Sequence, residues 1–199
     1  MASLMRAKFI LANALKTAIA SIRRIEQARA YQHYLMAPEA KAGISFEHGF
    51  VFERDMFGDQ RRYRGRWRFS KHFLGSDNVP AFDGEDQGEE FQCAQALDSL
   101  PAVKYWVRNV ARHPNAFWLP LASGKFYPDF VAMLNDGCVF VVEYKGAHLA
   151  GDGNEDTNEK RTIGQFWERL SQSGGLFLMA EKVVDGKDMR AQLLSKLGG

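Results

Sequence analysis

The spacing of apolar residues at the start of the chain predicts a long helix. Leu11, Leu15, Ile19 and Ile22 recur at helical intervals within residues 1–30, which is typical of an amphipathic helix that packs on a core. A lysine interrupts the apolar run, so the pattern favours folded structure over a cleaved leader peptide.

Two strand-like segments follow this helix. The first covers residues 50–53, and the second covers residues 62–69, where arginines alternate with Tyr63, Trp67 and Phe69. An alternation of period two places the guanidinium groups on one face of a strand and the aromatic rings on the other. The residues of the basic face are Arg62, Arg64, Arg66 and Arg68. This face is either the solvated side of a half-buried strand or a contact for nucleic acid.

A loop rich in Gly, Asp and Pro over residues 75–88 predicts a domain boundary. We expect a helix with a small basic, strand-containing extension in residues 1–85, and a second domain in residues 86–199. The second domain is predicted to be α/β, with a helix, a meander of three to four strands, a helix, a strand and a final helix in that order. Its predicted strands are residues 103–108, 116–121, 126–134, 138–145 and 176–180.

Local signals indicate where the helices of this domain begin. Asp86 and Glu89 have capping-box spacing ahead of a helix that runs to about residue 100. Asp156 and Glu159 repeat that spacing ahead of the second helix. The final helix is expected over residues 188–197.

The composition is that of an ordinary globular protein. The 199 residues are 46% hydrophobic and 25% charged, and no apolar run approaches the roughly 20 residues that a membrane span needs. Two cysteines without disulfide-framework or zinc-ligand spacing favour a reducing, cytoplasmic location. Residues 1–80 carry 14 Lys and Arg against 7 Asp and Glu, whereas residues 81–199 carry 12 against 17. A basic segment beside an acidic one suits a phosphate-binding surface next to a carboxylate metal site, although uneven surface charge gives the same totals.

The most informative stretch is a predicted hairpin. Its strands are joined by residues 135–137 (Asn-Asp-Gly), a turn that places the two strands in one register. In that register Asp129 lies opposite Glu143, and Lys145 shares their face because it is two residues from Glu143. The hairpin therefore brings two carboxylates and one lysine together.

Two directly opposed carboxylates repel each other unless a cation lies between them. A few oxygen ligands with room for water and a phosphate suit Mg²⁺ better than zinc. The lysine can hold an attacking water or offset charge that develops on a phosphate. The alternative is a solvated cluster of ion pairs at a strand end, but the opposed pair with a lysine on the same face favours a metal site.

At this point the sequence resembles the PD-(D/E)xK nuclease superfamily. The signature consists of Pro128 and Asp129, thirteen further residues, and then Glu143, Tyr144 and Lys145. More closely, the chain resembles the C-terminal endonuclease region of type III restriction enzyme Res subunits and related DEAD/DEAH-box restriction helicases. The segments that carry this resemblance are residues 90–98, 106–109, 126–130, 142–146 and 156–164.

The resemblance implies a restriction-endonuclease-like core and a Mg²⁺-dependent DNA endonuclease, in which Mn²⁺ is expected to substitute for Mg²⁺. It implies that Asp129 and Glu143 are metal ligands together with the backbone carbonyl of Tyr144. It implies that Lys145 positions or activates the attacking water. Glu90 is expected to join the catalytic site from the first core helix.

Two residues keep alternative interpretations. Helical-wheel geometry barely separates Glu90 from Glu89, and the family pattern decides for Glu90, which leaves Glu89 as a helix cap. Lys160 shares a face with Ile163 and Trp167, so it either reaches the site or a DNA phosphate, or extends into solvent at a helix start.

The resemblance also implies partners, namely DNA, a helicase motor and a methylation and recognition subunit. No phosphate-binding GxxxxGK loop occurs in the chain, so we expect either the excised C-terminal part of a larger protein or a stand-alone nuclease. The alternatives are a latent or non-catalytic DNA-binding and docking module of a restriction helicase, and a structure-selective, junction-resolving nuclease.

Overall fold

The computed structural model describes residues 2–36, 50–146, 155–171 and 173–198. The chain divides into two compact units, Met1–Ile44 with Pro120–Lys125, and Ser45–Leu119 with Phe126–Gly199. In the described part of the chain, no helix has the length and apolar character needed to cross a membrane.

The first unit contains the long helix α1 (Ala2–Met36), which confirms the predicted helix and extends it. The side chains of Leu11, Leu15, Ile19 and Ile22 are 53–63% exposed. The expectation that these residues pack on a core is therefore wrong.

The second unit is a layered α/β structure, as predicted. Its sheet has the order β1 (Val103–Arg108), β4 (Phe130–Leu134), β5 (Val139–Lys145) and β6 (Gly175–Glu181). The first three strands pair antiparallel, whereas β5 and β6 pair parallel and are connected through α3 (Glu155–Leu170).

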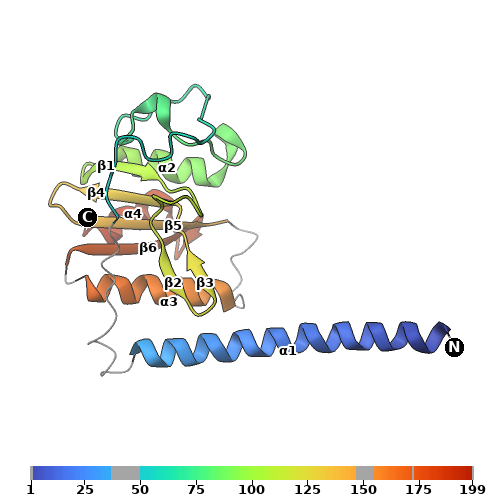
Figure 1. The fold of residues 1–199 in the computed structure, drawn as a ribbon. Helices are drawn as coiled ribbons and strands as arrows, with labels where there is room; N and C mark the ends of the chain where they lie inside the picture. The colour runs from blue at the N-terminus through green and yellow to red at the C-terminus, as the bar shows by residue number, and fades with distance from the viewer. Residues whose placement is uncertain (1, 37–49, 147–154, 172, 199) are drawn as a thin grey trace. The chain divides into compact units, whose positions relative to one another are not determined.

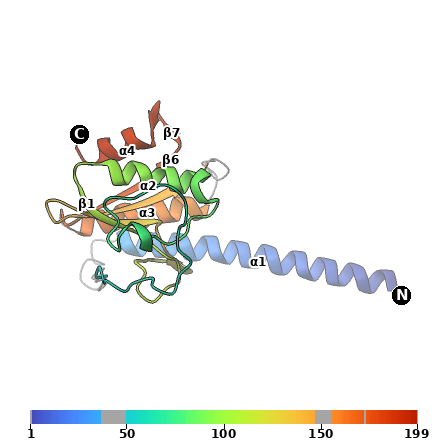
Figure 2. The same cartoon turned by 90° about the horizontal axis from the view of Figure 1, so that it is seen from above.

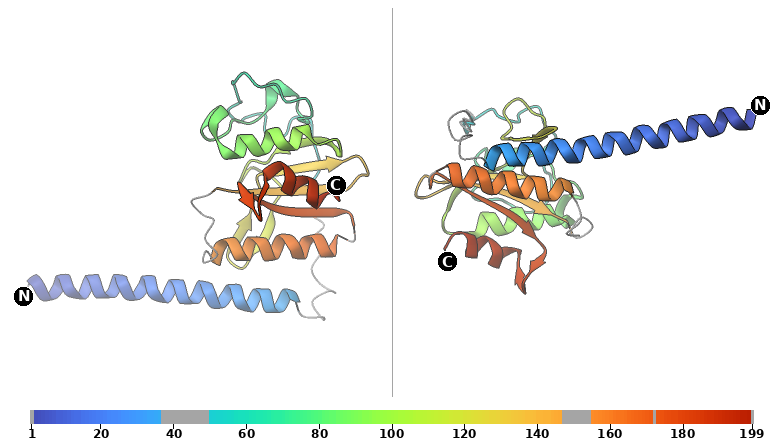
Figure 3. Two further views of the ribbon diagram at one scale, coloured as in Figure 1. Left: turned by 180° about the vertical axis from the view of Figure 1, so that it is seen from behind. Right: turned by 90° about the horizontal axis from the view of Figure 1, so that it is seen from below.

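Helices cover both faces of this sheet. Figure 1 shows α2 (Glu89–Ser99) and α3 on opposite sides of the strands. α2 lies beside α4 (Met189–Lys196), and both contribute to one core with alternate residues of the strands (Figure 2). α3 packs along β6, seen from behind and from below in Figure 3, and Gly164 of α3 lies directly against the ring of Phe177.

Short elements complete the fold. A hairpin joins β2 (Leu119–Leu121) to β3 (Gly124–Phe126), and another joins β7 (Val183–Val184) to β8 (Lys187–Asp188). Two 3₁₀ turns, η2 (Ser76–Asn78) and η3 (Glu85–Gln87), precede α2. The single strand predicted over residues 126–134 is divided between β3 and β4, because Pro128 has no N–H to donate to a strand ladder.

The strands predicted at residues 50–53 and 62–69 are not present. In the second segment only Arg62 forms an isolated bridge, to Pro80. Tyr63 and Phe69 are buried, but Trp67 is 47% exposed. The Trp67 N–H donates to the Tyr63 hydroxyl instead of to a neighbouring strand, and the backbone bends at residues 65 and 66.

The two capping-box predictions are also wrong. α2 begins at Glu89 after Gly88, with no side-chain cap, so neither Asp86 nor Glu89 caps it. Asp86 lies at the Tyr63 hydroxyl instead. Asp156 lies inside α3, where it forms an ion pair with Lys160.

Residues before the predicted boundary at residue 85 share the core of the α/β unit. The rings of Tyr63, Phe69 and Phe82 pack against one another and against Phe91 of α2, and Phe69 also contacts Trp106 of β1. Packing therefore continues across residue 85 without a break.

Candidate functional site

The register of the β4–β5 hairpin determines which side chains meet at its open end. Phe130 pairs with Val142 and Val131 pairs with Val141, which confirms the predicted register. Gly137 has a φ of 89°, a conformation that suits glycine, and its N–H donates to the Leu134 carbonyl to close the turn. Continued by one residue, this register places Asp129 opposite Glu143.

Hydrogen bonds hold Asp129 in that position. Its Oδ2 accepts from the backbone N–H of Tyr144 at 2.7 Å. Its backbone carbonyl accepts from the N–H of Asn109 at 2.7 Å, and the Asn109 side chain donates to the Pro128 carbonyl at 2.7 Å. The end of β1 therefore holds the Pro128–Asp129 peptide against the end of β5.

Burial raises the pKa of both carboxyl groups. Burial, and after it the negative charge of nearby Glu90, raise the pKa of Asp129 to about 7, although the Tyr144 N–H and the positive charges of Arg108 and Lys160 oppose the shift. Burial also raises the pKa of Glu143 well above its usual range, with Asp129 as the next cause, while Lys160 and the Asp129 backbone oppose this. The site disfavours two uncompensated negative charges.

One atom of this site lacks a partner. Glu143 Oε2 is buried and has no hydrogen bond, although Glu143 Oε1 lies 3.9 Å from Lys160 Nζ. Among the described residues, no group of three or more His, Cys, Asp or Glu side chains is arranged to hold a metal ion. The hairpin offers only two such side chains, the carboxylates of Asp129 and Glu143, and the backbone carbonyl of Tyr144 is a further oxygen donor for a metal ion. Hard oxygen donors of this kind fit Mg²⁺ or Mn²⁺ with water in the other positions.

The structure places the two candidate lysines of the site differently. Lys145 is 7% exposed and shares the face of β5 that carries Glu143. Lys160 of α3 contacts Asp156 at 3.2 Å and Glu143 at 3.9 Å, and its ammonium lies 5.5 Å from the centre of the Phe126 ring. The structure therefore brings Lys160 to the site.

The two neighbouring glutamates of α2 point to different surroundings. Glu90 lies close enough to Asp129 to raise its pKa, and it forms a two-pronged ion pair with Arg108 at 2.6 and 3.2 Å. Glu89 lies near the Tyr144 hydroxyl, whose pKa is raised by burial and by this carboxylate, and 3.6 Å from Lys182.

Sequence reasoning missed Arg108. Its guanidinium lies 5.3 Å from the centre of the Phe82 ring, and its position at the end of β1 is opposite Phe130, directly after Asp129. The sequence signal that could have identified Arg108 is its position at the end of a predicted core strand. No nearby residue in the sequence indicates that it pairs with Glu90.

The predicted arginine face becomes an exposed, irregular segment in the structure. All four of its arginines are exposed, and Arg62 and Arg64 line a cleft of about 150 Å³ that also includes Arg61 and Phe82. Arg66 and Arg68 do not line it. Phe82 lines this basic cleft and also contacts the guanidinium of Arg108. Arg108 in turn pairs with Glu90, which lies near Asp129.

No family model matches the chain, and no curated protein or solved structure is significantly similar to it.

Proposed function

We propose that this protein is a metal-dependent DNA endonuclease that hydrolyses phosphodiester bonds, with the restriction-endonuclease-like core that its motif resembles. The observation that carries the proposal is the buried Asp129–Glu143 pair, in which Glu143 Oε2 has no partner. A single divalent cation would neutralise both carboxylates and provide that partner.

Mg²⁺, or Mn²⁺ in its place, would be held by Asp129, Glu143 and the Tyr144 carbonyl. When bound there, the cation supplies a Lewis acid for a phosphate oxygen and lowers the pKa of a coordinated water. The N–H of Tyr144 fixes one oxygen of Asp129 at 2.7 Å and so keeps the carboxylate oriented.

The remaining chemistry belongs to the chain's own residues. Hydrolysis joins the oxygen of a water molecule to phosphorus and breaks one P–O bond of the DNA backbone. The Lys145 ammonium, on the face of β5 that carries Glu143, orients this water and offsets the negative charge that develops on the phosphate. Arg61, Arg62 and Arg64 at the basic cleft, with the exposed Arg66 and Arg68, would bind the DNA backbone irrespective of sequence.

A latent form of the same activity is a second candidate, because basic side chains of the protein itself face the acidic groups. Arg108 holds both oxygens of Glu90, and Lys160 faces Glu143. In this alternative the domain binds metal but cleaves DNA only together with the helicase motor and methylation subunit that the resemblance implies.

The test is a calorimetric titration of Mn²⁺ and of Mg²⁺ into wild type, Asp129→Ala and Asp136→Asn, with plasmid nicking measured on the same samples. Asp136 is the matched control, because it belongs to the same hairpin but lies in its turn, where it accepts from the Cys138 N–H. Its amide variant keeps that acceptor.

Metal binding and nicking that are lost in Asp129→Ala but kept in Asp136→Asn would support the nuclease. Binding without nicking would support the latent form. Wild type that binds neither cation, while its thermal unfolding remains cooperative, would overturn both candidates.

A further inference from the structure

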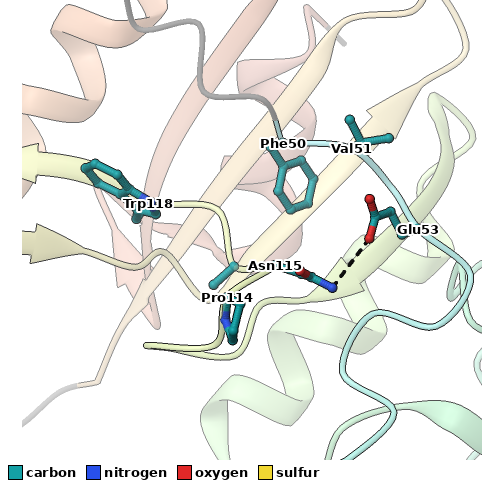
Figure 4. Close-up of a pocket in the computed structure, with 7 residues that line it drawn as sticks. Phe50, Val51, Glu53, Pro114, Asn115 and Trp118 are labelled. Atoms are coloured by element: carbon teal, nitrogen blue, oxygen red, sulfur yellow. Dashed lines mark hydrogen bonds between the residues drawn. The ribbon is translucent and has the colours of Figure 1, made fainter.

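A pocket of about 280 Å³ lies outside the carboxylate site, and its chemistry differs from that of the basic cleft (Figure 4). Its apolar lining consists of two aromatic rings and three smaller side chains, and its polar lining is one amide and one carboxylate. We call it the aromatic pocket, and its lining residues are Phe50, Val51, Glu53, Pro114, Asn115, Ala116 and Trp118.

The pocket belongs to the same end of the sheet as the carboxylates. β1 ends at Arg108, opposite Phe130, and the pocket loop of residues 109–118 leaves β1 at this point. Asn109 connects the two places, because its side chain donates to the carbonyls of both Phe117 and Pro128. A DNA strand at Asp129 therefore has this pocket at the same edge of the fold.

Internal contacts hold the loop in shape. The Asn109 side chain also accepts from the Phe117 N–H at 3.0 Å. His113 accepts from the Asn115 N–H at 3.1 Å and contacts Asp59 at 3.2 Å. The Phe50 ring stands edge-to-face against Phe117 at 5.7 Å. The pocket is therefore formed before any ligand arrives, as is usual for small-molecule sites.

The lining chemistry disfavours a phosphate and suits a nucleobase. Among the residues that the structure describes, no Lys or Arg lines the pocket, and the Glu53 carboxylate repels an anion. Phe50 and Trp118 offer the aromatic surface on which bases stack. In Figure 4 the Asn115 amide and the Glu53 carboxylate lie side by side, with Asn115 Nδ2 donating to Glu53 Oε2 at 3.5 Å.

We propose that the aromatic pocket binds one unpaired guanine of the DNA substrate. An amide donor beside a carboxylate matches the Watson–Crick edge of guanine, where O6 accepts and the adjacent N1–H and N2–H donate. Thymine offers a carboxylate only one donor. Because the pocket uses the edge that pairs in a duplex, the guanine must be extruded or single-stranded. The inference rests on the proposed nuclease function and specifies its substrate as DNA with an unpaired guanine near the cleaved bond.

The experiment measures fluorescence anisotropy of labelled single strands in EDTA, so that no metal takes part. Three probes of equal length are used: all thymine, thymine with one central guanine, and the same strand with inosine, which lacks the N2 amino group. Wild type is expected to bind the guanine strand at least about fivefold more tightly than the thymine strand, with inosine between them.

The variants assign this preference to the pocket. Glu53→Gln and Trp118→Ala are expected to lose the preference for guanine, whereas Asp77→Asn, an exposed acid of η2, is expected to keep it. Equal affinity of wild type for guanine and thymine strands, or a Glu53→Gln variant that keeps the full preference, would overturn the proposal. The inosine comparison uses wild type only and is therefore independent of whether a variant folds.

Failure of this proposal can be distinguished from failure of the proposed function. Asp129→Asn is expected to keep the guanine preference, since Asp129 does not line the pocket. Trp118→Ala is expected to keep Mn²⁺ binding. A preference for guanine without any metal binding would retain the pocket and reject the nuclease, and the reverse result would reject only the pocket.

Discussion

Asp129 and Glu143 have raised pKa values in the fold, and this has a definite consequence for stability. A carboxyl group whose pKa is higher in the folded than in the unfolded state binds more protons when folded. The free energy of unfolding therefore falls as pH rises between the unfolded pKa, near 4, and the folded pKa of about 7 for Asp129. The pKa of Glu143 is raised as well, so this carboxyl contributes a pH dependence of the same sign.

The first prediction concerns this pH dependence in the absence of metal. Asp129→Asn is expected to gain stability relative to wild type as pH rises from 5 to 8, with a melting-temperature difference at pH 8 on the order of 5 °C. Thermal unfolding of both proteins in EDTA measures it. The comparison is made between the two proteins because buried His72, whose pKa is lowered to about 4 by burial, contributes the opposite pH slope to both. A difference that does not change with pH would contradict the prediction.

The second prediction separates the role proposed for Lys145 from that of the proposed metal ligands. Lys145→Ala is expected to reduce nicking by about 100-fold or more, because the substitution removes the charge that we propose acts on the reacting phosphate. Mn²⁺ affinity should change little, since a lysine is not a ligand. Calorimetry and nicking on the same sample give both values. The exposed Lys187 is the control, and an equal loss in Lys187→Ala would contradict a specific role for Lys145.

At the scale of elements, the carboxylate site depends on how the ends of β1, β4 and β5 are joined. Asn109 forms hydrogen bonds with Pro128, Asp129 and Phe117, so one residue holds the Pro128–Asp129 peptide and the pocket loop together. The helix α3 also contributes to this site, because it brings Lys160 to Glu143. The same helix packs closely on β6.

The third prediction tests the packing of α3 on β6. Gly164→Ala is expected to destabilise the protein by about 1–3 kcal/mol, although alanine favours helices, because its Cβ would overlap the Phe177 ring. Denaturant unfolding measures the change. Gln165→Ala, an exposed neighbour on the same helix, should change stability by less than about 0.5 kcal/mol. A stabilised Gly164→Ala variant would show that this contact is not made.

At the scale of the whole molecule, the sequence is basic over residues 1–80 and acidic over residues 81–199. Within the α/β unit, basic and acidic side chains from these two parts of the chain lie near one another. Phe82 lines the basic cleft together with the arginines, and the guanidinium of Arg108, which pairs with Glu90, lies over the same ring. Under the proposed function, this arrangement would place the surface that binds DNA phosphates next to the site that binds the divalent cation.

The fourth prediction concerns the salt dependence of DNA binding. Replacing Arg62, Arg64, Arg66 and Arg68 together by Ala should weaken duplex binding at low salt. The slope of log K against log salt should become less steep by about 0.9 for each DNA phosphate that these arginines neutralise in the wild type. Anisotropy over a salt series measures the slope, with Arg190→Ala on α4 as the control. An unchanged slope would exclude these arginines from the DNA-binding surface.

Much of the α/β unit could be predicted from local signals. Alternation and the Asn-Asp-Gly turn predicted the β4–β5 register correctly, because turn geometry and side-chain period together permit few pairings. Asp188 at the start of α4 is a true cap, whose side chain accepts from the Ala191 N–H. Alternation failed at residues 62–69, where burial of Tyr63 and Phe69 reflects an aromatic cluster and not a strand.

What the sequence alone determined is therefore local: the helices, the core strands, and the meeting of Asp129 with Glu143 across one short turn. Three features emerge only from the packed fold: Glu90 pairs with Arg108, Lys160 reaches Glu143, and side chains from residues 50–53 and 114–118 line one pocket. Distance along the chain explains this difference. A hairpin is specified by residues that are close in sequence, whereas these contacts depend on how helices, strands and loops pack, and that packing leaves no local pattern.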